Sequence, residues 1–541
     1  MKPAIFLLLF IILSFQATLQ NHSSADSRQQ DKFRNSPLFG DNIIIHNVPG
    51  QDQNNIAICS AFNGWLYATY WYSNNTVPYL VLVKSTDHGK TWVKLYDDMN
   101  ALQNTIITIL NITACGLDTS DLKVFIGGCS KYTPTGNSGG FIGRFNGNNG
   151  VLEDGIFNGG WPVWDLSIAG DNLYPATNSN PFSMAVVYSR QLGNTDSVIV
   201  YTSDNGGLYL NRHYNIAASG NYIGKVSISY GRSPAYPGGR YFVCWEEKQN
   251  AGSPCGHIYT SHSEPYFNSP FTAPVQLDNL DPAIINKLNN PSISCQANAA
   301  DNDQANLSEL IVCEKYNAAN HQSGIVGFVN KTAITSSSYQ LFSIDTGTNN
   351  NIQPDINFNS FDSTFLLTYF DSTNTRLPFL TNNFNLLNPS SWDLVSDKYN
   401  ADNNLSAPSP RVTLDYDQRS AAFAWLADQT GGYKAGMFDA QFNFPVGIEE
   451  KGNSQELFIS RIYPNPASTS VEIEFCLKEK EYVTTSVINT LGQCVDVSVN
   501  QLYPKGLNKM KLDISNYLPG IYLLKVRAGR YFQVKKIQIF K

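Results

Sequence analysis

The 541-residue sequence has little charge and almost no helical patterning. Charged residues make up 15% of the chain, and the formal net charge is −7. No basic run is interleaved with aromatic residues, which excludes the usual pattern of a nucleic-acid-binding protein. Short apolar runs alternate with polar residues at a period of two and are separated by turn residues such as Asn, Ser and Gly. This pattern predicts an all-β protein.

Motifs for common enzyme chemistry are also missing. The sequence contains no HExxH, GxSxG, Walker or dinucleotide-binding motif. The seven histidines are isolated, and no spacing of cysteine and histidine resembles a zinc site. Asp301, Asp303 and Glu309 space oxygen ligands as some calcium loops do, but the turn glycine of such a loop is missing. We therefore expect no metal and no cofactor, with calcium at these three residues as the weaker alternative.

Only one apolar run is long, and it lies at the N-terminus. Ala4–Phe15 follows the positive Lys2 and is too short to span a bilayer, which takes roughly 20 residues. These features predict a secretory signal peptide over residues 1–20, cleaved within Ala17–Asn21, and a polar leader over 21–40. No other run approaches membrane-spanning length, so we expect export through the periplasm and no transmembrane segment.

The nine cysteines are an odd number for an exported chain, so at least one is unpaired. Several lie within apolar runs that resemble strands, such as "FVCW" around Cys244, which favours a role as small buried hydrophobic residues. Cys244 and Cys255 flank one predicted hairpin. They are the candidate disulfide.

An internal repeat organises the middle of the chain. An apolar run, a polar residue and a turn recur, as in "YATYWYSNNT" (67–76), "FVCWEEKQN" (242–250) and "AFAWLADQTG" (422–431). Shorter alternating stretches such as "KVSISYG", "NPSISCQ" and "QPDINFN" precede these runs, which gives seven units of roughly 45–60 residues. The units predict a seven-bladed β-propeller over 41–446, with six or eight blades as alternatives. The strand-like "DNIIIHN" (41–47) is expected to complete the last blade.

One stretch, "STDHGKTW" (Ser85–Trp92), follows the third strand of the first unit. A second, "TSDNGGLY", stands at the same place in the third unit. Both resemble the Asp-box of sialidase-like and other BNR-type propellers. This resemblance places the motif at Ser85, Asp87, Gly89 and Trp92, and again at Thr202, Asp204, Gly206 and Tyr209. In a four-stranded meander the turn between strands three and four lies at the end opposite the pocket, so we predict a structural role for the motif.

Chemistry is instead expected at the turns between strands two and three and at the crossovers between units. The charged residues placed there are Arg190, Glu246, Glu247, Glu314, Asp371, Arg376, Arg411 and Asp428. A sialidase-like mechanism would use an arginine cluster (Arg190, Arg376, Arg411) for a substrate carboxylate and Glu246 or Glu247 as a base. The family's early Arg-Ile-Pro element is missing, however, which favours solvated turn residues.

Composition changes after a polar linker at 447–456. Residues 451–541 carry 13 Lys and Arg against 7 Asp and Glu, whereas the rest of the chain carries 24 against 37. Such a charge asymmetry marks a separate domain with its own partner. Its short alternating strands predict a small Ig-like β-sandwich at 457–541.

Three motifs mark this tail: "IYPNPAS" (Ile462–Ser468), "NTLGQ" (Asn489–Gln493) and "LPGIYLLKV" (Leu518–Val526). The tail resembles the type A C-terminal sorting domain of the type IX secretion system of Bacteroidota. The resemblance implies that the secretion machinery is a partner and that the protein reaches the cell surface or the medium. The matching residues are Tyr463, Pro464, Asn465, Pro466, Gly492, Leu518, Gly520 and Tyr522.

The sequence thus predicts a secreted or surface-displayed propeller that binds a glycan or a protein. The alternatives are a sialidase-like glycoside hydrolase and an extracellular structural module without a small-molecule site. Binding is favoured over catalysis because neither the Arg-Ile-Pro element nor a Tyr–Glu pair is evident. The sequence does not identify the residues that bind the ligand.

Overall fold

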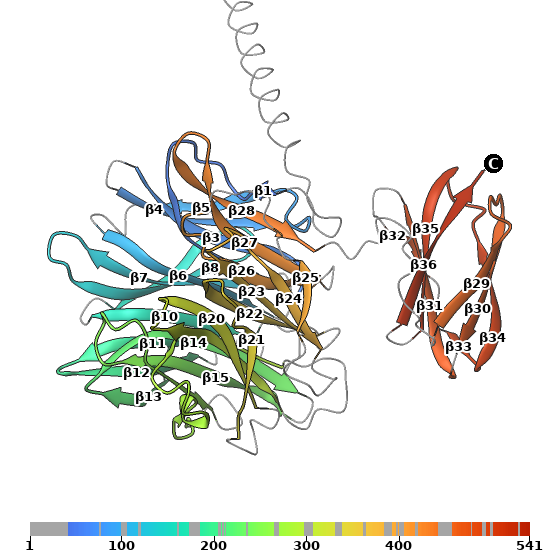
Figure 1. The fold of residues 1–541 in the computed structure, drawn as a ribbon. Coiled ribbons are helices and arrows are strands. Elements are labelled where there is room, and N and C mark those ends of the chain that lie inside the picture. Colours follow the sequence, from blue (N-terminus) through green and yellow to red (C-terminus); the bar gives the residue numbers. More distant parts are fainter. Residues whose placement is uncertain are drawn as a thin grey trace, which may run out of the picture. The chain divides into compact units, whose positions relative to one another are not determined.

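The computed structural model divides after residue 443 into two compact units, and each is described by itself (Figure 1). It describes residues 42–540 except 75–76, 99–104, 117–120, 159–161, 172–183, 204–206, 208–209, 211, 234–235, 264–269, 297–306, 331–337, 361–363, 384–391, 397–398, 400–404, 417–419, 442–456, 478, 490–493, 498–500 and 529–530. The predicted signal peptide, leader and linker lie outside the described residues. No helix in the described ranges is long and apolar enough to cross a membrane.

The first unit consists of seven four-stranded sheets in the described residues. The first four sheets contain β2 (Gln53–Ser60), β3 (Leu66–Asn74), β4 (Val77–Ser85), β5 (Val93–Asp98); β6 (Thr105–Cys115), β7 (Lys123–Tyr132), β8 (Ser138–Asn146), β9 (Leu152–Asn158); β10 (Val163–Gly170), β11 (Met184–Leu192), β12 (Thr195–Ser203), β13 (Arg212–Ser219); and β14 (Tyr222–Ser233), β15 (Tyr236–Lys248), β16 (His257–His262), β17 (Val275–Gln276). A 3₁₀ turn, η1 (Asp278–Leu280), follows. The other three contain β18 (Leu288–Cys295), β19 (Glu309–Asn317), β20 (Gln322–Asn330), β21 (Gln340–Asp345); β22 (Asn351–Asn359), β23 (Thr364–Asp371), β24 (Phe379–Asn383), β25 (Asp393–Ser396); and β26 (Arg411–Asp415), β27 (Ser420–Gln429), β28 (Tyr433–Ala440) with β1 (Ile43–Ile44).

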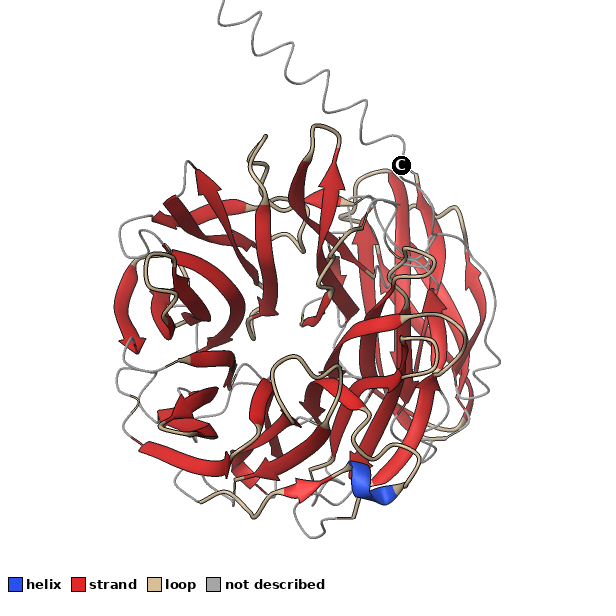
Figure 2. Cartoon of the chain, turned by 60° about the vertical axis from the view of Figure 1, so that its left-hand side comes forward, coloured by secondary structure: helices blue, strands red, loops and turns tan. Residues whose placement is uncertain are grey.

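These sheets form a closed ring. The first strands β2, β6, β10, β14, β18, β22 and β26 each contact the first strand of the next sheet, and β26 contacts β2. Figure 2 shows the sheets grouped around one axis. Ile43 pairs with Phe438 and Ile44 with Met437, so a strand from the start of the chain completes the last sheet. The prediction for "DNIIIHN" is confirmed, and the fold is all-β and propeller-like.

Apolar side chains between neighbouring sheets hold the ring together. One cluster joins the first two sheets through Tyr67, Leu82, Ile126 and Phe145, all of which are buried. Because successive residues of a strand point to opposite faces, each strand sends one apolar row to each neighbouring sheet. The continuous apolar runs of the sequence, such as that of β27, therefore reflect burial on both faces of a sheet.

The turn at Ser85–Trp92 lies between β4 and β5. The Ser85 hydroxyl oxygen accepts a hydrogen bond from the Gly89 amide at 2.8 Å. The Asp87 carboxylate accepts bonds from the Thr91 amide at 2.9 Å and from the Thr91 hydroxyl at 2.7 Å. Hydroxyl and carboxylate thus satisfy the donors of a tight turn, as expected for these residue types.

The second copy of this turn begins one residue later than predicted. The equivalent bond runs from the Gly207 amide to the Ser203 hydroxyl oxygen at 2.9 Å. The bond needs a left-handed glycine four residues after the hydroxyl, and Gly207 has φ +70° where Gly89 has +82°. The predicted Asp204, Gly206 and Tyr209 lie outside the described residues.

Replacing Asp87 with alanine is expected to destabilise the first unit by about 1–3 kcal/mol, because the Thr91 donors lose their charged acceptor. Ligand binding per folded molecule should not change. Chemical denaturation and a binding isotherm on the same preparation check this. Unchanged stability together with lost binding would contradict a structural role for the turn.

The predicted disulfide between Cys244 and Cys255 is wrong, because both are free thiols. Cys244 lies in the middle of β15, where it pairs with Thr260 of β16 and is completely buried between sheets. This burial raises the pKa of its thiol. Cys255 precedes β16, and its thiol donates instead to the Asn286 carbonyl oxygen at 3.2 Å.

The second unit contains two sheets around one core. A three-stranded sheet consists of β29 (Leu457–Tyr463), β30 (Ser470–Leu477) and β34 (Gly506–Asp513). The other consists of β32 (Cys494–Val497), β31 (Glu481–Asn489), β35 (Gly520–Ala528) and β36 (Tyr531–Ile539), with β33 (Gln501–Tyr503) also paired to β31. Phe475, Val487, Leu524 and Ile537 are among the side chains that fill the space between them.

Motif residues from the two ends of this tail come together. The Asn465 side chain accepts from the Gln538 amide at 2.8 Å and donates to the Lys536 carbonyl at 3.0 Å. The Tyr522 hydroxyl donates to the Leu518 carbonyl at 2.9 Å, while the Leu518 side chain is 76% exposed. The "IYPNPAS" motif thus holds the last strand, β36, through the hydrogen bonds of Asn465. Gly492 lies outside the described residues.

Candidate functional site

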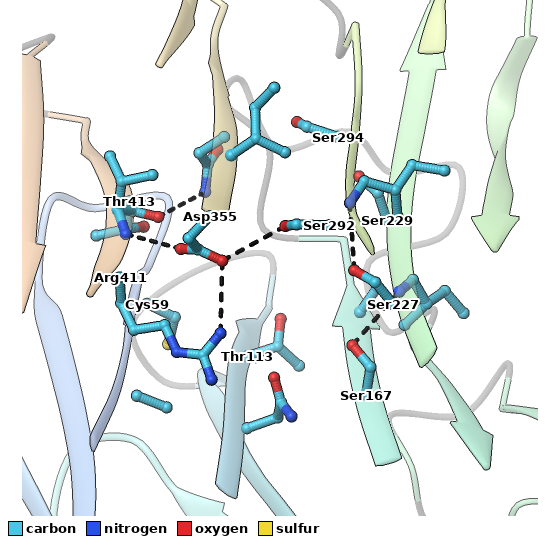
Figure 3. A pocket seen from close by; sticks show the side chains of 18 of the residues that line it. Cys59, Thr113, Ser167, Ser227, Ser229, Ser292, Ser294, Asp355, Arg411 and Thr413 are labelled. Atoms are coloured by element: carbon cyan, nitrogen blue, oxygen red, sulfur yellow. Dashed lines mark hydrogen bonds and ion pairs between the residues drawn. The ribbon is translucent and has the colours of Figure 1, made fainter. Parts of the chain in front are cut away.

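A central cavity of about 330 Å³ lies within the ring, which is at the small end of the usual range for ligand pockets. The seven strands β2, β6, β10, β14, β18, β22 and β26 all contribute to its lining. Figure 3 shows that most of the labelled side chains around it are serine or threonine. The cavity is therefore polar, and no single sheet forms it alone.

The serine hydroxyls join one sheet to the next. The Ser167 oxygen accepts from the Ile228 amide at 3.4 Å, and the Ser227 oxygen accepts from the Ile293 amide at 3.3 Å. The first strands of neighbouring sheets do not pair as a β-ladder, so these amides need side-chain acceptors. Because each hydroxyl accepts through its oxygen, its proton stays available to a ligand.

Two carboxylates occupy equivalent positions in this arrangement. Asp165 accepts from the Val226 amide at 2.9 Å, and Asp355 accepts from the Val412 amide at 2.8 Å. Burial raises the pKa of both carboxyl groups, although a nearby cation opposes the effect in each case. Carboxylates here satisfy backbone donors first, which leaves them few lone pairs for a ligand.

The cations of the site are less fully engaged. The Arg411 Nη1 lies 3.5 Å from Asp355 Oδ1, and the buried Arg411 Nε has no hydrogen-bond partner among the residues that the structure describes. Lys225 Nζ lies 3.7 Å from Asp165 Oδ2, which is beyond hydrogen-bond distance. Arg411 and Lys225 both line the cavity, and each lies beside one carboxylate, Asp355 for Arg411 and Asp165 for Lys225. The site therefore offers cationic donors that its own carboxylates engage only at long distances.

Arg411 is the only one of the five predicted catalytic candidates among the described residues that line this cavity. The Arg376 Nε instead pairs with Asp371 Oδ2 at 2.9 Å within the turn after β23. Burial tends to raise the pKa of Asp371, but hydrogen bonds from Asn374 and Arg376 outweigh it and lower the pKa. Arg190 pairs with Ser197 between β11 and β12. The three arginines do not converge in the cavity.

The predicted glutamates join neighbouring sheets. Glu246 accepts from the Asn290 amide at 2.9 Å, and Glu314 accepts from the Gln353 amide at 2.9 Å. In both cases the carboxylate lies on the second strand of one sheet and accepts from an amide of the first strand of the next sheet. Glu247 accepts from the Ser219 hydroxyl at 2.6 Å. Asp428 likewise accepts from the Ser406 amide, at 3.1 Å.

Lys225, Ser227 and Asp355 were not predicted as site residues from the sequence. They lie in "KVSISYG" and "QPDINFN", stretches that were assigned only as strands. The available signal was that such stretches place polar residues at alternate positions directly before the most apolar strand of a unit. In a ring of sheets, that position faces the axis.

Among the described residues, no group of three or more His, Cys, Asp or Glu side chains is placed to hold a metal. Asp301 and Asp303 of the calcium alternative lie outside the described residues. Glu309 begins β19 and is completely buried, where its carboxylate accepts a hydrogen bond from Tyr339. Burial raises the pKa of Glu309 to about 7.

Residues 461–540 match the family described as the secretion system C-terminal sorting domain. The tail is thus a type IX sorting domain, which implies interaction with the secretion machinery and indicates export to the cell surface or beyond it. No curated protein matches the chain in sequence.

Several solved structures are similar in fold. A protein of unknown function from Dyadobacter fermentans has 12% identity and a TM-score of 0.40, covering 75% of this chain and 99% of its own. The α-L-arabinofuranosidase Arb93A from Fusarium graminearum has 12% identity and a TM-score of 0.42, covering 74% and 98%. An exo-β-1,3-galactanase from Phanerochaete chrysosporium has 10% identity and a TM-score of 0.33, covering 92% and 98%. Scores this low carry no argument about the ligand.

Proposed function

We propose that the chain is an exported seven-bladed β-propeller, over 41–446, that binds an acidic glycan in its central cavity. An Ig-like sorting domain at 457–541 carries it out of the cell. The observation that supports the ligand class is the pair of loosely engaged cations, Arg411 and Lys225, in a cavity lined with hydroxyls. Arg411 and Lys225 complement a carboxylate or sulfate group, and the serine hydroxyls complement the oxygens of a sugar.

Cavity size favours a glycan over a protein ligand. A volume of about 330 Å³ admits one or two sugar units. A specific protein interface instead buries roughly 1,200–2,000 Å² of surface. The cavity cannot supply such an area, so a protein would have to bind elsewhere on the unit.

Binding of acidic glycans should depend on Arg411. Replacing Arg411 with glutamine is expected to weaken binding roughly 10- to 150-fold, because a charge-assisted hydrogen bond contributes about 1.5–3 kcal/mol. The test presents the full chain to an array of oligosaccharides that end in glucuronate, sialic acid or galactose 6-sulfate, alongside neutral counterparts. Calorimetry then gives the affinities of wild type and variant.

Arg376→Gln is the matched control, since Arg376 pairs with Asp371 outside the cavity. We expect it to bind acidic glycans as the wild type does, after correction for the folded fraction. Equal retention of neutral and acidic glycans would refute the proposed ligand class. Loss of binding in Arg376→Gln but not in Arg411→Gln would place the site elsewhere.

Hydrolysis of the bound glycan is the second candidate function. The observation in its favour is Asp355, a carboxyl group in the cavity whose pKa burial raises, as a general acid requires. Against it, the described lining contains no glutamate that could form a Tyr–Glu pair. Turnover of fluorogenic sialosides and glucuronides by the same preparation decides between binding and hydrolysis, and we expect none.

A further inference from the structure

An aromatic pair lies at the seam between the third and fourth sheets, three residues before the cavity lining begins on each of the two strands that carry it. The rings of Trp164, in β10, and Tyr222, which opens β14, have centroids 5.7 Å apart and are tilted by 51°. Both side chains are partly exposed. The Trp164 Nε1 donates to Asp196 Oδ2 at 3.1 Å, which fixes the orientation of the indole. The ring faces are therefore held in place rather than free to rotate.

Gly224 makes room for this pair. A Cβ at Gly224 would lie 2.9 Å from the Tyr222 ring and 2.3 Å from the Glu246 carboxylate. Only a residue without a side chain lets that ring and that carboxylate approach the same stretch of backbone. Burial, together with the carboxylates of Glu246, Asp165 and Asp196, raises the pKa of Tyr222 to about 12. Aromatic faces and acceptor oxygens thus lie together.

This region differs in chemistry from the cavity, although the same two strands, β10 and β14, contribute to both. The cavity contains the cations Arg411 and Lys225, whereas carboxylates lie around the aromatic pair. Lys225 links the two, because it lines the cavity and faces Asp165, the residue that follows Trp164. A ligand that extends from the cavity past Lys225 would meet the aromatic pair.

We propose that Trp164 and Tyr222 form a second subsite, which takes a neutral sugar unit next to the acidic unit held in the cavity. The apolar C–H face of a sugar ring packs on the partly exposed aromatic rings, whereas the buried carboxylates around them hold the rings and the backbone in place. The ligand is accordingly an oligosaccharide with an acidic end unit. This inference rests on the proposed function of the cavity.

The test compares a terminal sugar with a longer chain. The monosaccharide probes are free glucuronate, sialic acid and galactose 6-sulfate, and each is compared with a trisaccharide that it terminates. We expect the full wild-type chain to bind one trisaccharide at least roughly tenfold more tightly than its monosaccharide. Trp164→Ala and Tyr222→Ala should each remove most of that gain and leave the affinity for the monosaccharide unchanged. Trp164→Phe, which keeps a ring, should restore part of it.

Tyr132→Ala is the control, because Tyr132 is an aromatic residue at the end of β7 that is 40% exposed and outside the cavity lining. The Tyr132→Ala variant should keep the full gain in affinity of the trisaccharide over the monosaccharide. If a monosaccharide binds but the trisaccharide binds no more tightly, the subsite is refuted while the cavity proposal stands. If no acidic probe binds, both the subsite and the proposed function of the cavity are refuted. Equal losses in Tyr132→Ala and Trp164→Ala would also refute the subsite.

Discussion

A chain that lacks residues 457–541 is expected to stay in the periplasm of its native host instead of reaching the cell surface or the medium. The tail matches a sorting domain over 461–540 and forms a compact unit with its own core. Its removal should leave the first unit folded, because the ring closes through β1 and β28 without any strand from the tail. Fractionation and immunoblotting of cells that produce each form measure the effect.

The converse experiment separates sorting from folding. A periplasmic reporter fused to residues 447–541 should leave the cell, because the sorting information is expected to lie in the tail alone. Circular dichroism and denaturation of the truncated chain show whether the first unit is still folded. Normal export of the truncated chain would contradict the sorting assignment, whereas retention of an unfolded chain would leave only the reporter result to decide.

The pattern of apolar and polar residues predicted the fold well because, in a β-strand, the polarity of each residue follows whether its side chain is buried. The runs around Cys244 and Trp425 are nearly all apolar, and both residues lie in strands packed between two sheets. The closing strand at Ile43–Ile44 was also predictable, since "DNIIIHN" precedes the first sequence repeat and reads as a strand that this repeat does not need. These predictions rested on the local pattern of apolar and polar residues and on the strand that the last repeat lacked.

The site was harder to predict because sequence spacing does not encode distance from the axis of a ring. Arg376 and Arg411 both follow turns, but only Arg411 begins a first strand and lines the cavity. Arg376 is held by Asp371, five residues earlier in the same hairpin. The second turn was difficult for a related reason: Thr202 and Ser203 both carry a hydroxyl, and the bond from the Gly207 amide to Ser203 depends on the backbone geometry at Gly207.

Replacing Gly89 with alanine is expected to destabilise the first unit by about 2–5 kcal/mol, more than any other single change considered for it. Gly89 has φ +82°, a conformation that costs a residue with a side chain roughly 1–2 kcal/mol. A Cβ there would also lie 1.9 Å from Phe438 Cε1. Phe438 is buried in β28 and packs edge-on against Trp92, so it cannot move aside without disrupting the last sheet. Overpacking of this kind typically costs another 1–3 kcal/mol.

Gly432→Ala isolates the conformational part of this cost. Gly432 has φ +77°, yet a Cβ there would meet nothing within 4 Å. We therefore expect it to lose only about 1–2 kcal/mol, the cost of the left-handed backbone. Denaturation of both variants under the same conditions gives the difference, which measures how tightly the turn packs on the neighbouring sheet. Equal losses would show that the Gly89 turn does not press on Phe438.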